Sequence, residues 1–97
     1  MKTSNPYNVQ LSATSVDTCL WHIQREIMQR HGAAFADRAM SPLRYYINTG
    51  RASALFLRLL INARPVIVAR DLAKGGSDSE VIDRICKRIG YNREEVC

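Results

Sequence analysis

The side chains that could carry out chemistry are few and widely separated in this sequence. Cys19, Cys86 and Cys97 have no CxxC spacing and no histidine beside them, which indicates neither a zinc site nor a disulfide framework. His22 falls beside an apolar stripe, and His31 falls where it would stabilise the C-terminal end of a helix. Nucleophilic or acid–base catalysis needs a nucleophile, a base and an orienting group within hydrogen-bond reach. The sequence offers no such set, so we expect no catalytic residue and no enzyme.

Nucleotide cofactors are not indicated either. Gly75-Gly76 stands without the Lys-Ser/Thr pair that would complete a phosphate-binding loop. We therefore expect a binding protein with no metal and no cofactor.

Positive charge is the clearest functional signal. The chain has 14 Lys+Arg against 9 Asp+Glu, a net charge of +5. Residues 38–70 contain no acid and six arginines, which are Arg38, Arg44, Arg51, Arg58, Arg64 and Arg70. A basic, acid-free centre is typical of a protein that binds phosphates or an acidic protein. The alternative is that the arginines only solubilise exposed helix faces.

Candidate DNA contacts follow from this distribution. We predict that Arg44, Arg51 and Arg58 bind DNA phosphates, and that a smaller cluster near the C-terminus, Arg84, Lys87, Arg88 and Arg93, does so more weakly. Tyr45 and Tyr46 would point about 100° apart on a helix. We expect one of them in the core and one on the surface, with no base stacking.

These residues must be positioned by helices, because the apolar spacing is helical almost throughout. Val16, Leu20, Ile23 and Ile27 recur at steps of 4, 3 and 4, which predicts a helix over about 15–31 with Ser15 as its N-cap, or an earlier start near Ser12.

The next helical segments are shorter. We expect a short helix over 33–40 and a new one beginning at Ser41-Pro42, because proline is readily accommodated in the first turn. Gly50 would end it. Residues 65–70 could form a short strand or a helix opened by Pro65.

Residues 52–61 are the most apolar run of the chain and carry one charge. We expect this segment to be buried on most sides, at the centre of the core or of a subunit interface. The predicted dimer-interface residues are Leu55, Phe56, Leu57, Leu59 and Leu60.

The last third has clear helix-end signals. Ser77 and Glu80 form an S-x-x-E capping box, and Gly90 ends an apolar stripe made of Val81, Ile82, Ile85, Cys86 and Ile89. Asn92 could cap a second start, which would make 77–97 resemble the first half of a helix-turn-helix; a generic helical hairpin is the alternative. We therefore divide the chain into a helical dimerisation domain, 1–74, and a mobile helix-turn-helix-like tail, 75–97.

The sequence resembles the FlhD family, the helical subunit of the bacterial flagellar master transcription activator. The similar stretches, within about 11–70, are Ile23-Gln24-Arg25-Glu26-Ile27-Met28-Gln29, a small-residue segment with Phe35, Leu55-Phe56-Leu57-Arg58-Leu59-Leu60, Asn62 and Val66-Ile67-Val68. A Met-x-Thr-Ser start is shared as well. The length is closest to shorter relatives from conjugative plasmids and integrative elements. The resemblance implies an all-α homodimer that joins a zinc-binding FlhC-like partner and activates transcription with RNA polymerase.

Together these observations predict an all-α fold of about five helices in an intertwined homodimer. A chain of this length has a thin core, which favours self-association. No window is apolar enough to span a membrane, and the N-terminus lacks a signal-peptide core, so we expect a cytoplasmic protein. The expected function is a DNA-binding activator subunit in a hetero-oligomer. The alternative is a small phage- or plasmid-encoded protein that binds and inhibits a host protein complex.

Overall fold

A hairpin of two long helices organises the structure, a computed structural model that describes residues 13–93. Helices α1 (Ala13–His31) and α2 (Ala33–Asn48) run antiparallel and are joined at Gly32, whose φ is +90°. Three shorter helices follow: α3 (Ala54–Asn62), α4 (Pro65–Ala73) and α5 (Asp78–Ile89). Within the described range every regular element is helical, so the predicted all-α class with about five helices is confirmed.

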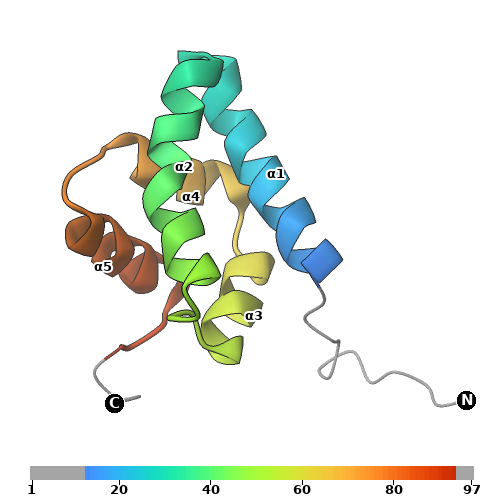
Figure 1. The fold of residues 1–97 in the computed structure, drawn as a ribbon, viewed down its shortest axis with the longest axis vertical. Coiled ribbons are helices and arrows are strands. Elements are labelled where there is room, and N and C mark those ends of the chain that lie inside the picture. Colours follow the sequence, from blue (N-terminus) through green and yellow to red (C-terminus); the bar gives the residue numbers. More distant parts are fainter. Residues whose placement is uncertain (1–12, 94–97) are drawn as a thin grey trace, which may run out of the picture.

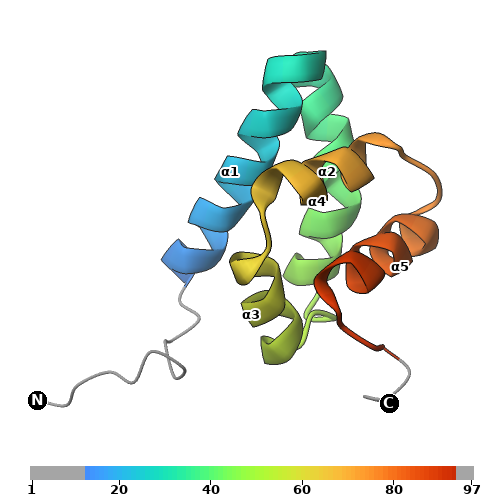
Figure 2. The same ribbon diagram turned by 180° about the vertical axis from the view of Figure 1, so that it is seen from behind.

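The short helices pack around the hairpin. Helices α3 and α4 lie on one face of the hairpin, in front in Figure 2, and α5 lies beside α2 and α4 (Figures 1 and 2). One hydrophobic core collects residues from all five helices and extends to Tyr91. No helix among residues 13–93 combines the length and the apolar character needed to cross a bilayer.

Helix α1 has the apolar face that the spacing predicts. Leu20, Ile23 and Ile27 are buried there. The helix begins at Ala13, close to the earlier of the two expected starts, and Ser15 therefore lies inside it. The prediction of Ser15 as the N-cap is wrong.

Helix α2 corrects the expectation of two separate helices. It runs through Pro42 without interruption, and Ser41 lies in its interior. Its buried residues, Ala36, Met40, Leu43 and Tyr46, are spaced at 4, 3 and 3. A proline inside a helix costs about 3 kcal/mol. The continuous apolar face that these four residues present to the core outweighs that cost.

Residues 65–70 form helix rather than strand. Pro65 is at the start of α4, where its missing N–H leaves no hydrogen bond unmade, and Val68, Ala69 and Leu72 are buried. A lone strand would have had no strand to pair with among residues 13–93.

Helix α3 is less buried than its composition suggests. Ser53 caps it by accepting a hydrogen bond from Phe56 N at 3.1 Å. Phe56 and Leu60 are buried, whereas Leu55 is 50% exposed. The expectation of burial on most sides is wrong for the single chain, because α3 lies at the edge of the hairpin and offers only one face to the core.

Helix α5 begins and ends as predicted. Ser77 and Glu80 form the reciprocal capping box, and Gly90 ends the helix in the left-handed conformation. Val81, Ile82, Ile85 and Cys86 are buried in the common core. The predicted boundary after residue 74 therefore does not divide the hydrophobic core into two. The second start expected after Asn92 falls on residues outside the described range.

Candidate nucleic-acid interface

The junction between α4 and α5 contains the only charged side chain that is buried within the described chain. Asp71 is 1% exposed. Its Oδ2 accepts a hydrogen bond from Arg88 Nε at 2.8 Å and its Oδ1 one from Arg88 Nη2 at 3.3 Å. Lys74 Nζ lies 3.7 Å from Oδ1. The hydrogen bond and charge of Asp71 raise the pKa of Arg88 further above its ordinary value.

Arg84 strengthens the same junction through the backbone. Its Nη1 donates to the carbonyl oxygens of Asp71 at 2.9 Å and of Gly75 at 3.0 Å. These carbonyls lie at the end of α4, where helical acceptors lack intrahelical partners. Two of the four predicted DNA-binding residues near the C-terminus, Arg84 and Arg88, thus bind oxygen atoms of α4 and the turn after it, although the Arg88 side chain is still 48% exposed.

The other two members of that cluster, Lys87 and Arg93, line one groove at the C-terminal end of α5. Arg93 Nη1 forms an ion pair with Asp83 Oδ1 at 2.6 Å, and its guanidinium lies 5.7 Å from the centre of the Tyr46 ring. Lys87 is exposed on α5. Arg84, Arg88 and Arg93 are therefore held by oxygen acceptors of the chain itself, whereas Lys87 forms no ion pair within residues 13–93.

The three predicted DNA-binding arginines of the central region, Arg44, Arg51 and Arg58, form no ion pair within residues 13–93. Arg44 Nη2 donates to Gln24 Oε1 at 2.6 Å, and Arg51 stacks 6.0 Å from the centre of the Tyr45 ring. Arg58 is exposed on α3. Tyr45 is 55% exposed and Tyr46 only 9%, so the expected division into one surface and one core tyrosine is confirmed.

Carboxylate pairing distinguishes the two groups of arginines. Among residues 13–93, none of the six arginines of residues 38–70 forms an ion pair, and five of them are exposed, Arg44 being partly buried. The ion pairs of this range use Lys74, Arg88 and Arg93 instead. The acid-free centre of the sequence is therefore a set of surface arginines whose charge is not neutralised within the described chain.

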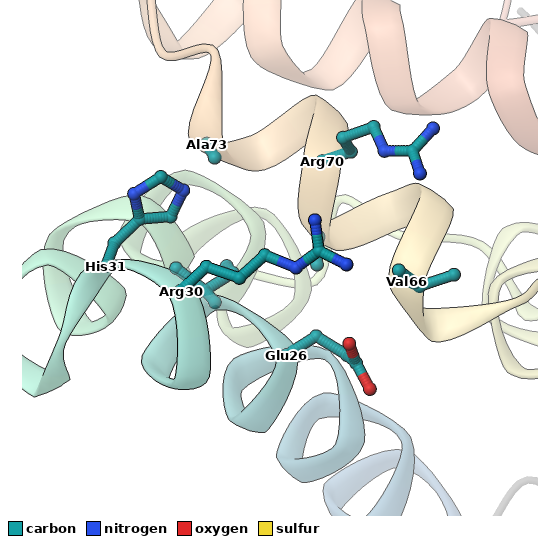
Figure 3. A pocket seen from close by; sticks show the side chains of 8 residues that line it. Glu26, Arg30, His31, Val66, Arg70 and Ala73 are labelled. Atoms are coloured by element: carbon teal, nitrogen blue, oxygen red, sulfur yellow. The ribbon is translucent and has the colours of Figure 1, made fainter.

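A small cleft between α1 and α4 brings together residues that the sequence analysis did not connect. Arg30 and His31 lie in the last turn of α1 and Arg70 in the last turn of α4 (Figure 3). The cleft encloses about 60 Å³, and its remaining lining is Glu26, Ile27, Val66, Ala69 and Ala73. His31 packs on Phe35 with ring centres 4.6 Å apart. No local sequence pattern could have shown that these residues line one cleft, because α1 and α4 are distant in sequence.

The predicted dimer-interface residues occupy two environments. Phe56 and Leu60 are buried in the core of the chain itself, so they are not available to a second subunit in this conformation. Leu57 and Leu59 are partly buried, and Leu55 is half exposed. Of the five predicted residues, only the three that are not fully buried could therefore contribute to an interface between folded subunits.

The cysteines do not form a reactive or metal-binding centre in the described part of the chain. Burial raises the pKa of the Cys19 thiol to about 11, and its Sγ lies 3.7 Å from the carbonyl oxygen of Leu60. Burial also raises the pKa of Cys86. Residues 13–93 contain no group of three or more His, Cys, Asp or Glu side chains that could hold a metal ion.

No protein family, curated protein or solved structure matches this chain.

Proposed function

We propose that this protein is a DNA-binding subunit of a transcription regulator that contacts backbone phosphates through its central arginines. The observation that supports this most strongly is that the six arginines of residues 38–70 lack carboxylate partners within the described chain. Guanidinium groups match the geometry of phosphate oxygens and remain charged at all physiological pH values.

The arginines near the C-terminus are left out of the proposed DNA-binding surface. Arg84, Arg88 and Arg93 already bind carbonyl or carboxylate oxygens, so we assign their main role to fixing α5. Arg58 lies on α3, Arg64 in the segment between α3 and α4, and Arg70 on α4.

We further propose that the subunit works with a partner protein, as its resemblance to the FlhD family implies. The all-helical fold agrees with that implication. In this proposal the subunit forms a homodimer and binds an FlhC-like partner, and the assembly contacts RNA polymerase. The half-exposed Leu55 and the partly buried Leu59, one turn further along α3, would supply apolar area to the homodimer. Leu57 lies on the other flank of the buried face of α3.

A salt titration tests the DNA contact. Binding to a duplex of random sequence should weaken steeply with salt, with a log–log slope of about 0.9 per neutralised phosphate. Arg58→Ala and Arg64→Ala should each lower the slope by about that amount without changing sequence preference. Arg25→Ala removes the same charge from an exposed position of α1 that is not among the predicted DNA contacts, and it should leave the slope unchanged. A wild-type protein that does not bind DNA, alone or with its co-purifying partner, would contradict the proposal.

A second candidate function is inhibition of a host protein complex. Trp21, Tyr45 and Leu55 are large apolar side chains that are each at least half exposed, and aromatic residues of this kind are enriched in protein interfaces. Charge reversal at Arg44 and Arg51 distinguishes the two functions. Variants that bind DNA normally and lose a protein partner would favour the inhibitor.

A further inference from the structure

We infer that the cleft between α2 and α5 is a docking site for an extended acidic segment of a protein partner, with one carboxylate of that segment held by the Tyr46 hydroxyl and Arg51. The inference rests on the proposed function only in requiring a protein partner, and it names the chemistry by which that partner is recognised. It assigns Arg51 to the partner and leaves the other central arginines to DNA.

The cleft lies between two helices that run side by side in Figure 1. It encloses about 400 Å³, within the roughly 300–1,000 Å³ typical of ligand sites. Pro42, Tyr45 and Tyr46 contribute to its lining from α2, and Ile82 contributes from α5. Aromatic and apolar groups therefore offer contact area beside the charged groups of the same cleft.

The Tyr46 hydroxyl is the group that most directly indicates a ligand. Tyr46 is 9% exposed, and its ring packs edge-on against Phe56 with ring centres 5.1 Å apart. Its Oη has no hydrogen-bond partner within residues 13–93, whereas every fully buried side-chain oxygen and nitrogen of that range has one. The hydroxyl therefore reaches the surface, and the surface that Tyr46 lines is this cleft.

Two guanidinium groups lie near this hydroxyl. Arg93 lies 5.7 Å from the centre of the Tyr46 ring, and Arg51 lies 6.0 Å from the centre of the neighbouring Tyr45 ring. Burial raises the pKa of Tyr46, and the charges of Arg93 and Arg51 partly offset this rise, so both charges act on the hydroxyl. Tyr46 therefore stays a neutral O–H donor at physiological pH, in a field that favours an acceptor with negative charge.

The ion pairing in the cleft leaves Arg51 for a carboxylate. Arg93 already pairs with Asp83, whereas Arg51 forms no ion pair within residues 13–93. Asp78 is the acid that lines the cleft, and it lies in the first turn of α5, where the helix N-terminus stabilises it. A carboxylate from outside the chain would accept hydrogen bonds from both Arg51 and the Tyr46 hydroxyl.

The extent of the surface favours a protein segment over a nucleic-acid backbone. Arg93 also lines a second cleft, which includes Lys87 and Gly90 at the end of α5. The two clefts thus follow α5 over its 12 residues, a length of about 18 Å. About five residues of extended chain cover this distance. Tyrosine and arginine are enriched in protein interfaces, whereas a row of phosphates would use the charges and leave the apolar lining uncovered.

The first experiment selects binders from a library of random heptapeptides displayed on phage, with the full chain immobilised. We expect the enriched peptides to carry Asp or Glu next to apolar residues, and synthetic copies of them to shift the NMR signals of Tyr45, Tyr46 and Ile82. Replacing the acid of such a peptide by its amide should weaken binding about tenfold, through loss of a charge-assisted hydrogen bond. Enrichment of peptides without acids, or no enrichment, would overturn the inference.

The second experiment measures the affinity of variants for one selected peptide. Tyr46→Phe removes only the hydroxyl, so it should keep the wild-type Tm and weaken binding about tenfold. Arg51→Ala should weaken binding at least as much, and Arg51→Lys should recover part of the loss, because it keeps the charge without the planar donors. Arg25→Ala, at an exposed position of α1 outside the cleft, is the matched control and should bind as the wild type does. Wild-type affinity in Tyr46→Phe and Arg51→Ala would refute the site.

Asp78 provides an internal check. Its carboxylate lines the cleft and would repel an acidic peptide, so Asp78→Asn should strengthen binding. Asp17→Asn makes the same change in net charge at an exposed position of α1 and should not. Equal strengthening by both variants would mean that the peptide is attracted only by net charge, and the site would be wrong.

Duplex DNA separates the docking site from the proposed DNA contact. Tyr46→Phe keeps every arginine and should bind DNA with the wild-type salt slope. If the wild type binds the peptides through Tyr46 and Arg51 but does not bind DNA, the docking site stands and the DNA contact fails. If DNA binds and the variants bind the peptide normally, the docking site fails and the DNA contact stands. A loss of DNA affinity or of a homodimer in Tyr46→Phe would identify the occupant as a phosphate backbone or a second copy, and would overturn the inference.

Discussion

Arg88 on α5 donates a hydrogen bond of 2.8 Å from Nε to Oδ2 of Asp71 on α4, and this carboxylate is almost completely removed from solvent. A buried carboxylate is tolerated only when its oxygens are paired. The contact therefore makes the position of α5 a condition for keeping Asp71 in the core.

Asp71→Asn should destabilise the protein by about 2 kcal/mol, because it replaces charge-assisted hydrogen bonds by weaker ones at a buried position. Urea unfolding measures the loss. The double variant Asp71→Asn with Arg88→Gln should lose less than the sum of the two single variants, since both remove the same interaction. Lys87→Gln, at an exposed neighbour of Arg88, is the control and should leave stability unchanged.

Ser77→Ala should cost about 1 kcal/mol through the loss of the N-cap. The effect should be local, with faster hydrogen exchange of α5 amides and little change in α1 and α2. Ser79→Ala, at an exposed position that does not cap the helix, is the matched control. Equal loss of protection in all five helices would show that α5 unfolds only with the whole chain and is no separate mobile tail.

Charged substitutions on α3 should separate association from folding. Leu55→Asp alters a half-exposed side chain, so the chain should stay folded and the proposed homodimer should dissociate. Leu60→Asp buries a charge in the core and should unfold the protein. Light scattering and circular dichroism measure the two effects. A wild type that is monomeric at micromolar concentration would refute the homodimer.

Cys19 should resist alkylation in the folded protein. Burial raises its pKa from 9.0 to about 11, which lowers the thiolate fraction about 100-fold near neutral pH. Because the fold favours the protonated thiol, this contribution to stability is complete below pH 9.0 and is lost as the pH rises toward 11. Mass spectrometry after iodoacetamide treatment should find Cys19 modified rapidly only in urea. Equal rates in both states would contradict the raised pKa.

Local signals in the sequence predicted the ends and faces of several helices. The capping box at Ser77 and Glu80 and the stripe of α1 depend on residues three and four positions apart, so both could be identified from spacing. The continuity of α2 through Pro42 could not, because it depends on packing against the rest of the core.

Contacts between segments that are distant in sequence could not be predicted. Asp71 lies three residues after Val68 and one before Leu72, on the buried side of α4. Its burial could not be predicted while residues 65–70 were compatible with either strand or helix. The hydrogen bonds from Arg88 on α5 to Asp71 arise from the tertiary fold, so the spacing of residues in the sequence could not predict them. The sequence showed that Arg84 and Arg88 lie near the C-terminus, but it could not show that they bind oxygen atoms of α4.

The turn before α5 links two positions in a way that would constrain evolutionary change. Gly76 has a φ of +116°, and a Cβ placed on it would come within 2.8 Å of Glu80 Oε1, the atom that accepts a hydrogen bond from Ser77 N. A side chain at residue 76 would thus combine an unfavourable backbone conformation with displacement of the cap. Gly75, around which a Cβ would meet open space, has only the first constraint. In diverging copies of this gene, residues 76 and 80 should therefore change together or stay fixed, whereas residue 75 can drift to asparagine independently.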